Sequence, residues 1–146
     1  MDSYIKYKIF PESRFIVEFM MGDLDYELFL DHKKRLFNDD EHDENYCVLS
    51  VLSHSKILLT ADDVERYKSY LTDNKKVVGT RKVAVLTDTP KHVVISTIYK
   101  NAVKEFPMRF KIFSTYSAAL QWLNVSEEYE SKILELFYPG KGKIVR

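Results

Sequence analysis

The sequence predicts an α/β fold: a mostly parallel sheet with an antiparallel hairpin at its N-terminal edge, flanking helices and an extra C-terminal helix. Two observations lead to this prediction. Two strand-like segments joined by a short turn open the chain, and three further strand-like segments then alternate with helix-like ones. Such alternation is typical of parallel sheets whose crossover connections are helices. One more helix-like segment follows the last of these units.

The N-terminal hairpin is predicted from residues 4–10 and 14–21, which are rich in β-forming side chains and flank a Pro-Glu-Ser turn. A helix follows, capped by Asp23 or Asp25 and running to about Phe37. Acidic residues lie in its first turns and basic residues in its last turn, which complements the helix dipole.

Two nearly continuous apolar runs, at 46–52 and 83–87, predict strands that are covered on both faces. Between them, Thr60 is predicted to cap a helix, with Asp63 three residues on in a capping-box-like arrangement. The apolar stripe of this helix consists of Val64, Tyr67 and Leu71.

After the second buried run, Thr89 is predicted as a helix cap with Pro90 at the first helical position, and Pro107 as the end of that helix. Its apolar residues at helical spacing are Ile95, Ile98, Ala102 and Phe106. Residues 109–113 are predicted to form the last strand.

Thr115 is predicted to cap a short helix, and Ser126 a final helix with one apolar face. That face consists of Tyr129, Ile133, Leu136 and Phe137. We therefore expect one domain over residues 1–124, an appended helix of the same domain over 125–138, and a flexible tail over 139–146.

Composition narrows the classes of function. Lys plus Arg and Asp plus Glu number 22 each, which argues against a nucleic-acid or anionic-membrane binder. The one cysteine allows no intramolecular disulfide. The N-terminal residues do not resemble a signal peptide, and no apolar run approaches the roughly 20 residues that span a bilayer. We expect a cytoplasmic protein without a cofactor.

Three local motifs, taken in order, resemble the STAS domain, the fold of anti-sigma-factor antagonists and of sulfate-transporter tails. Gly22-Asp23-Leu24-Asp25 is similar to the family's turn between second strand and first helix, and residues 82–90 to its fourth strand and following turn. Phe113, Ala119, Trp122 and Leu123 resemble its last strand and helix, in the form seen in bacterial proteins of combined STAS and CRAL-TRIO-like character. The resemblance covers about residues 4–124. It implies a STAS-like fold with a regulatory or lipid-binding role.

The chain departs from signalling STAS domains between Ser50 and Asp63, where those domains carry a phosphorylated serine in an Asp-Ser-Ser-Gly-type motif. The nearest hydroxyl is Thr60, with no serine pair and no glycine, and Asp62 and Asp63 would repel an added phosphate. We favour Thr60 as a helix cap over Thr60 as a phosphorylation site.

Polar residues follow two of the predicted buried strands. Ser53 and His54 follow the first, while Thr87, Asp88 and His92 follow the second. Because α/β sheets place ligands at the carboxyl ends of parallel strands, these residues are predicted to line one crevice, with ordinary loop and cap polarity as the alternative. No two histidines have the spacing of a zinc helix, so no metal site is predicted.

The leading hypothesis is a non-catalytic regulatory module that binds a partner protein, with the last helix as a homodimer contact. The alternative is a carrier or sensor of a small apolar or anionic ligand, in a pocket formed by displaced helices near Val93 to Tyr99. An enzyme using His54, Asp88 and His92 is disfavoured because the sequence contains no catalytic motif.

Overall fold

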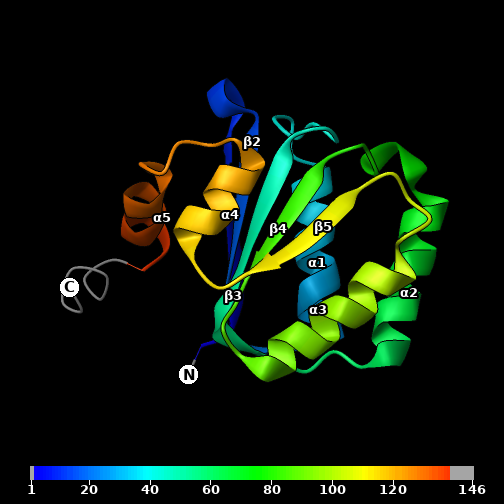
Figure 1. Ribbon diagram of the computed structural model, residues 1–146. Coiled ribbons are helices and arrows are strands. Elements are labelled where there is room, and N and C mark those ends of the chain that lie inside the picture. Colours follow the sequence, from blue (N-terminus) through cyan, green and yellow to red (C-terminus); the bar gives the residue numbers. More distant parts are fainter. Residues whose placement is uncertain (1, 139–146) are drawn as a thin grey trace.

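The protein is described here from a computed structural model covering residues 2–138, a single sheet with helices on both faces (Figure 1). The predicted order of elements is confirmed. The strands are β1 (Tyr4–Phe10), β2 (Phe15–Leu24), β3 (Cys47–Ile57), β4 (Lys82–Leu86) and β5 (Arg109–Phe113). The helices are α1 (Tyr26–Phe37), α2 (Ala61–Asp73), α3 (Pro90–Ala102), α4 (Tyr116–Leu123) and α5 (Tyr129–Phe137), with 3-10 turns at Pro11–Ser13 and Lys75–Val77.

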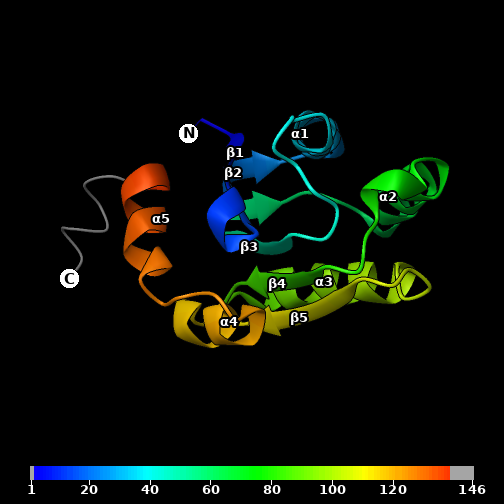
Figure 2. The same cartoon turned by 90° about the horizontal axis from the view of Figure 1, so that it is seen from above.

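The strands lie in the sheet in chain order, β1-β2-β3-β4-β5. The β1–β2 pair is antiparallel and the other pairs are parallel, as predicted. Because parallel crossovers are right-handed, a sheet that grows in one direction has its crossover helices on one face. Accordingly, α1, α2 and α3 cover one face, here called the α1–α3 face, and α4 and α5 cover the other, the α4–α5 face (Figure 2).

Strand alternation divides the apolar side chains between these faces. In β2, Phe15, Val17 and Phe19 belong to the core under α4 and α5. Ile16 and Met20 belong to the core of the opposite face. Both faces of the central strands are thus buried, which explains why their sequences are nearly continuous apolar runs.

Helix α5 packs against the sheet on the α4–α5 face. Its side chains Tyr129, Ile133 and Phe137 are buried, as predicted, and Phe137 stacks on Phe19 at a centroid distance of 5.4 Å. The prediction that Leu136 shares this buried face is wrong, because Leu136 is 50% exposed. The predicted flexible tail, 139–146, lies outside the described residues.

Side-chain caps begin three helices where the sequence predicts them. Asp25 accepts from the backbone N–H of Leu28, Thr115 caps α4, and Thr60 and Asp63 form a complete capping box.

The other two predicted caps have different outcomes. Thr89 is the N-cap residue of α3 and Pro90 begins the helix, as predicted, but the Thr89 side chain makes no cap hydrogen bond, and its backbone N–H donates to Thr87 Oγ1. The predicted cap at Ser126 is wrong, because helix α5 begins at Tyr129. Ser126 stabilises only the turn before the helix, accepting from the N–H of Glu128.

Three element bounds differ from the prediction. Strand β2 continues through Gly22 to Leu24, and β3 continues to Ile57, because the two strands go on pairing beyond a β-bulge. Helix α3 ends at Ala102, so Phe106 lies beyond it and the predicted extension to Pro107 is wrong. Among residues 2–138, no helix is long and apolar enough to cross a membrane.

Candidate functional site

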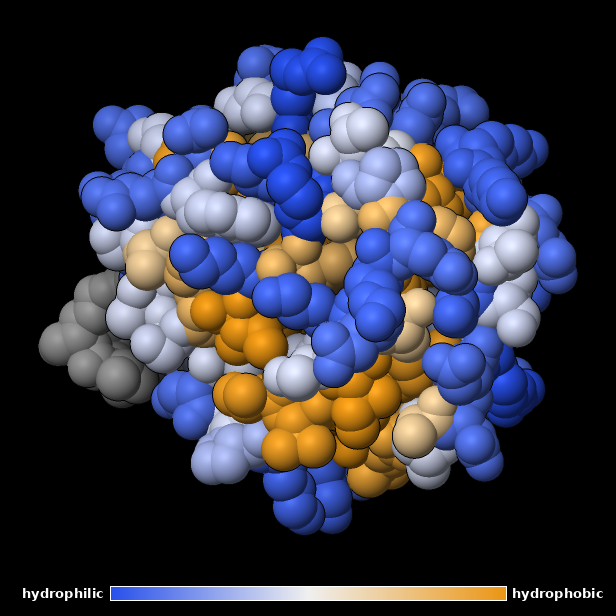
Figure 3. All heavy atoms as spheres, turned by 45° about the vertical axis from the view of Figure 1, so that its right-hand side comes forward, coloured by the Kyte–Doolittle hydropathy of each residue, from blue (hydrophilic) through white to orange (hydrophobic). Residues whose placement is uncertain are grey.

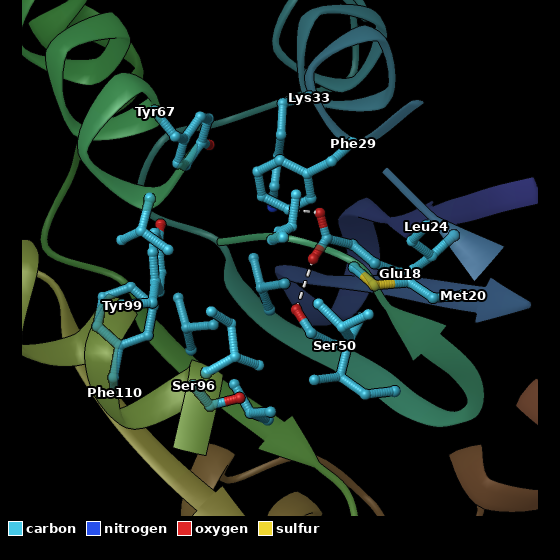
Figure 4. Close-up of a pocket in the computed structure, with 18 of the residues that line it drawn as sticks. Glu18, Met20, Leu24, Phe29, Lys33, Ser50, Tyr67, Ser96, Tyr99 and Phe110 are labelled. Atoms are coloured by element: carbon cyan, nitrogen blue, oxygen red, sulfur yellow. Dashed lines mark hydrogen bonds and ion pairs between the residues drawn. The ribbon is translucent and has the colours of Figure 1, made fainter. Parts of the chain in front are cut away.

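The α1–α3 face is not completely filled. A cavity of about 110 Å³ lies between the sheet and the three helices that cover it. Most of its lining is apolar, and the residues labelled in Figure 4 surround it from all of these elements. They include Met20 and Leu24 of β2, Phe29 of α1, Tyr67 of α2, Tyr99 of α3 and Phe110 of β5.

Several apolar side chains of this lining remain only half-buried although they belong to the interior. Phe29, Ile95 and Phe110 are of this kind. Since well-packed protein interiors leave few voids larger than a water molecule, this void is a feature that packing alone does not require. Cavities that combine apolar walls with a few polar groups are the usual form of small-molecule sites.

The polar part of the wall is centred on Glu18 in the middle of β2, whose side chain is completely buried. Its Oε1 lies 2.8 Å from His32 Nε2 and 2.5 Å from Lys33 Nζ, both of α1. Its Oε2 accepts a hydrogen bond of 2.5 Å from Ser50 Oγ of β3. Glu18 and Ser50 are direct neighbours in the β2–β3 register, and Figure 4 shows both at the cavity wall.

These contacts fix the charges of the cluster. Burial raises the pKa of Glu18, but the Lys33 ammonium and the hydrogen bonds from His32 and Lys33 outweigh it and hold the pKa well below its usual range. Burial lowers the pKa of His32, so its imidazole is neutral near pH 7. His32 Nδ1 is buried and has no hydrogen-bond partner among the described residues. The cluster is therefore one carboxylate balanced by one ammonium.

Arg81 contributes the second cation of the lining, and it is 5% exposed. Its guanidinium is held by the acidic loop, the connection between α1 and β3 over residues 38–46, and donates to the backbone oxygens of Glu44 at 2.7 Å and Asp43 at 2.5 Å. The same group lies 2.8 Å from His42 Nε2. These contacts show that the loop fixes the orientation of the Arg81 side chain.

Within residues 2–138, no group of three or more potential ligand side chains is arranged to hold a metal ion.

The predicted common crevice of His54 and His92 is not formed. The His54 ring stacks on the Phe19 ring at a centroid distance of 5.2 Å, and Phe19 belongs to the α4–α5 face. His92 is buried on α3, where its Nδ1 lies 2.8 Å from Thr87 Oγ1. The two imidazoles therefore have different surroundings, His54 against Phe19 and His92 against Thr87 and the backbone of Ser55.

A β-bulge in β3 determines the face of the sheet on which His54 lies. The three-residue step from Val51 to His54 in β3 lies opposite the two-residue step from Phe19 to Met21 in β2. The extra residue reverses the alternation, so His54 points away from the face that Ser50 and Leu52 share.

The other predicted site residues are scattered. Ser53 and Asp88 are exposed, and Thr60 is engaged in its capping box. Tyr99 does line the cavity, and its pKa is raised by burial. Of the six candidates, only Tyr99 belongs to this site.

The sequence interpretation missed the Glu18 cluster and Ser50. A signal was present, because each is a single polar residue inside a run of apolar ones that predicts a buried strand. A carboxylate in such a run must find partners, since burying an unpaired charge is costly. Those partners, His32 and Lys33, lie 14 and 15 residues away.

Apolar side chains also reach the surface on this side of the molecule (Figure 3). Leu58, in the connection before α2, is 45% exposed, and Val93 and Val94 of α3 are 39% and 60% exposed. Their neighbours Ile57, Leu59 and Ile95 line the cavity, so this patch adjoins it.

A five-stranded sheet with one antiparallel edge pair and these flanking helices defines a STAS-like, or SpoIIAA-like, α/β domain. The chain is similar to the crystal structure of an uncharacterised protein of the DUF3478 family with a SpoIIAA-like fold, from Shewanella loihica PV-4. The TM-score is 0.53 at 16% identity, over 83% of this chain and 93% of that one. This likeness shows the fold alone. The sequence matches no protein-family model and no curated protein.

Proposed function

We propose that this chain is a non-catalytic binding domain that takes up a small, mainly apolar molecule between its sheet and helices α1, α2 and α3. The cavity is the observation that supports this function. Its volume of about 110 Å³ is somewhat below the roughly 150 Å³ that accommodates benzene in an engineered apolar cavity. Ligands of about six or seven heavy atoms are therefore at the upper limit of what it holds, and larger ones require the helices to move apart.

The methionine residues provide an internal test. Met20 and Met108 line the cavity, whereas Met21 packs in the core of the opposite face. With methyl-labelled methionine, titration with toluene should shift the NMR signals of Met20 and Met108 and leave that of Met21 in place. Equal shifts at all three methyl groups, or no shift at saturating toluene, would contradict the proposal.

A matched pair of variants separates the cavity from the rest of α3. Ser96→Leu adds apolar volume at a lining position, whereas Thr97→Leu makes the same kind of change at its exposed neighbour. Toluene binding should be lost in Ser96→Leu and retained in Thr97→Leu. Retention in both variants would place the bound toluene elsewhere.

A second candidate function is a regulatory module that binds a protein partner, including a second copy of this chain. The SpoIIAA-like fold fits this role, and the exposed side chains Leu58, Val94 and Leu136 support it. Sedimentation velocity tests self-association directly. A dimer lost in Leu136→Ser would favour contact through α5, one lost in Val94→Ser would favour the patch beside the cavity, and a monomer at all concentrations would exclude both.

A further inference from the structure

The α1–α3 face of the sheet is apolar except where Glu18 and Ser50 interrupt it. The other buried positions of β2, β3 and β4 on this face are Ile16, Met20, Leu24, Val48, Leu52, Val83 and Val85. Replacing a buried ion pair by apolar residues is often neutral or stabilising, so stability alone does not account for the Glu18–Lys33 pair. Both Glu18 and Ser50 lie on the cavity wall, where a bound molecule would meet them (Figure 4).

The hydrogen bonds already made at this wall determine which kind of ligand group could add another. A carboxylate only accepts, and Glu18 already receives His32 and Lys33 at Oε1 and Ser50 at Oε2. The single hydroxyl hydrogen of Ser50 is used in that bond. Among the described residues, no donor reaches Ser50 Oγ, so its lone pairs are available at the cavity. A ligand group that adds a hydrogen bond at this wall must therefore be a donor.

Charge balance disfavours ligands with an ionised end. A ligand carboxylate would lie beside Glu18, and the cations of the lining, Lys33 and Arg81, are already paired with Glu18 and with the acidic loop. A ligand ammonium would compete with Lys33. The other carboxylate of the lining, Asp63, accepts from the backbone N–H of Thr60 and pairs with Arg66 at 3.5 Å.

We infer that the cavity selects an uncharged apolar molecule that carries one hydroxyl group, and that this hydroxyl donates to Ser50 Oγ beside the Glu18 carboxylate. The inference rests on the proposed function, and it adds the chemical class of the ligand. Phenol is the simplest probe of this class, because it is close to toluene in size and remains un-ionised at pH 7.

The test compares phenol with toluene in two proteins. In Glu18→Met/Lys33→Met/Ser50→Ala, the wall becomes apolar and the buried pair is removed as a unit. The ratio of the toluene to the phenol dissociation constant should fall about tenfold relative to wild type, which corresponds to one hydrogen bond of about 1.4 kcal/mol. The ratio matters, because the hydroxyl of phenol also costs free energy to remove from water. Continued toluene binding confirms that the variant is folded.

The wild-type protein supplies a second arm that needs no variant. Benzoate and benzylammonium should bind at least tenfold more weakly than phenol. Benzoate binding as tight as that of phenol, or an unchanged toluene-to-phenol ratio in the triple variant, would overturn the inference while leaving the proposed function intact. Failure of both toluene and phenol to bind wild type would instead contradict the proposed function itself.

Discussion

Removing Lys33 should destabilise the fold strongly, because the Glu18 carboxylate would remain buried without its counter-charge. Glu18 is completely buried, while the Lys33 side chain is 14% exposed. Breaking a buried pair by removing one partner costs about 3–5 kcal/mol, and the partial exposure of Lys33 favours the lower end. We expect the free energy of unfolding of Lys33→Met to be about 3 kcal/mol lower than that of wild type. For a denaturant slope near 2 kcal/mol per M, this corresponds to a decrease of about 1.5 M in the urea midpoint.

The companion variant decides whether the pairing is the cause. Glu18→Met/Lys33→Met removes both charges, and its free energy of unfolding should lie within about 1 kcal/mol of the wild-type value. The pH dependence gives a further check. In wild type the depressed pKa of Glu18 contributes stability that is present above its ordinary value of 4.5 and lost below it. The difference in the free energy of unfolding between wild type and Lys33→Met should therefore become smaller as the pH falls below 4.5. A double variant as unstable as Lys33→Met alone would refute this reasoning.

Three further predictions concern other parts of the fold. Burial and the Arg81 guanidinium lower the pKa of His42 to about 4 from 6.5, so the unfolded chain binds more protons in that window and stability falls as pH drops through it. Discounted for the partial exposure of His42, the loss in the free energy of unfolding is about 1–2 kcal/mol. Urea titrations at several pH values should show this loss in wild type but not in His42→Gln. The same pH dependence in both proteins would contradict the assignment of the loss to His42. Thr60→Ala removes the capping box of α2 and should lower the free energy of unfolding by about 1 kcal/mol, so an unchanged urea midpoint would contradict the role of the cap. Gly22 has a φ of 78°, and an added Cβ would lie 2.7 Å from the backbone oxygen of Asp2. Gly22→Ala should therefore cost more than the roughly 1 kcal/mol of left-handed strain alone; a thermal melt matching wild type would count against this.

The order of elements follows from local patterns, which explains why the sequence predicts it. The apolar runs at 46–52 and 83–87 are typical of strands that are buried on both faces. The caps at Thr60 and Thr115 depend on neighbours three residues away. Such features need no knowledge of the tertiary fold. The predicted end of α3 is wrong because packing sets this boundary. Val103, and not Phe106, is the completely buried residue there.

The candidate site depends on relations that the pattern does not contain. Whether His54 faces Ser50 or Phe19 is decided by a one-residue bulge in β3. The partners of Glu18 come from a helix whose rotation is fixed by packing, so its polar character is visible in the sequence but its contacts are not. The cavity itself reflects the distance between helices and sheet, which no residue spacing encodes.

The most direct test of the account is to locate a bound ligand. A crystal soaked with bromobenzene, which is close to toluene in size, should show one anomalous bromine peak between β2, β3 and α3, within contact distance of Met20 and Tyr99. A peak confined to the surface beside Leu58 and Val94, or no peak at a concentration that shifts the methionine signals, would contradict the claim that the cavity is the binding site.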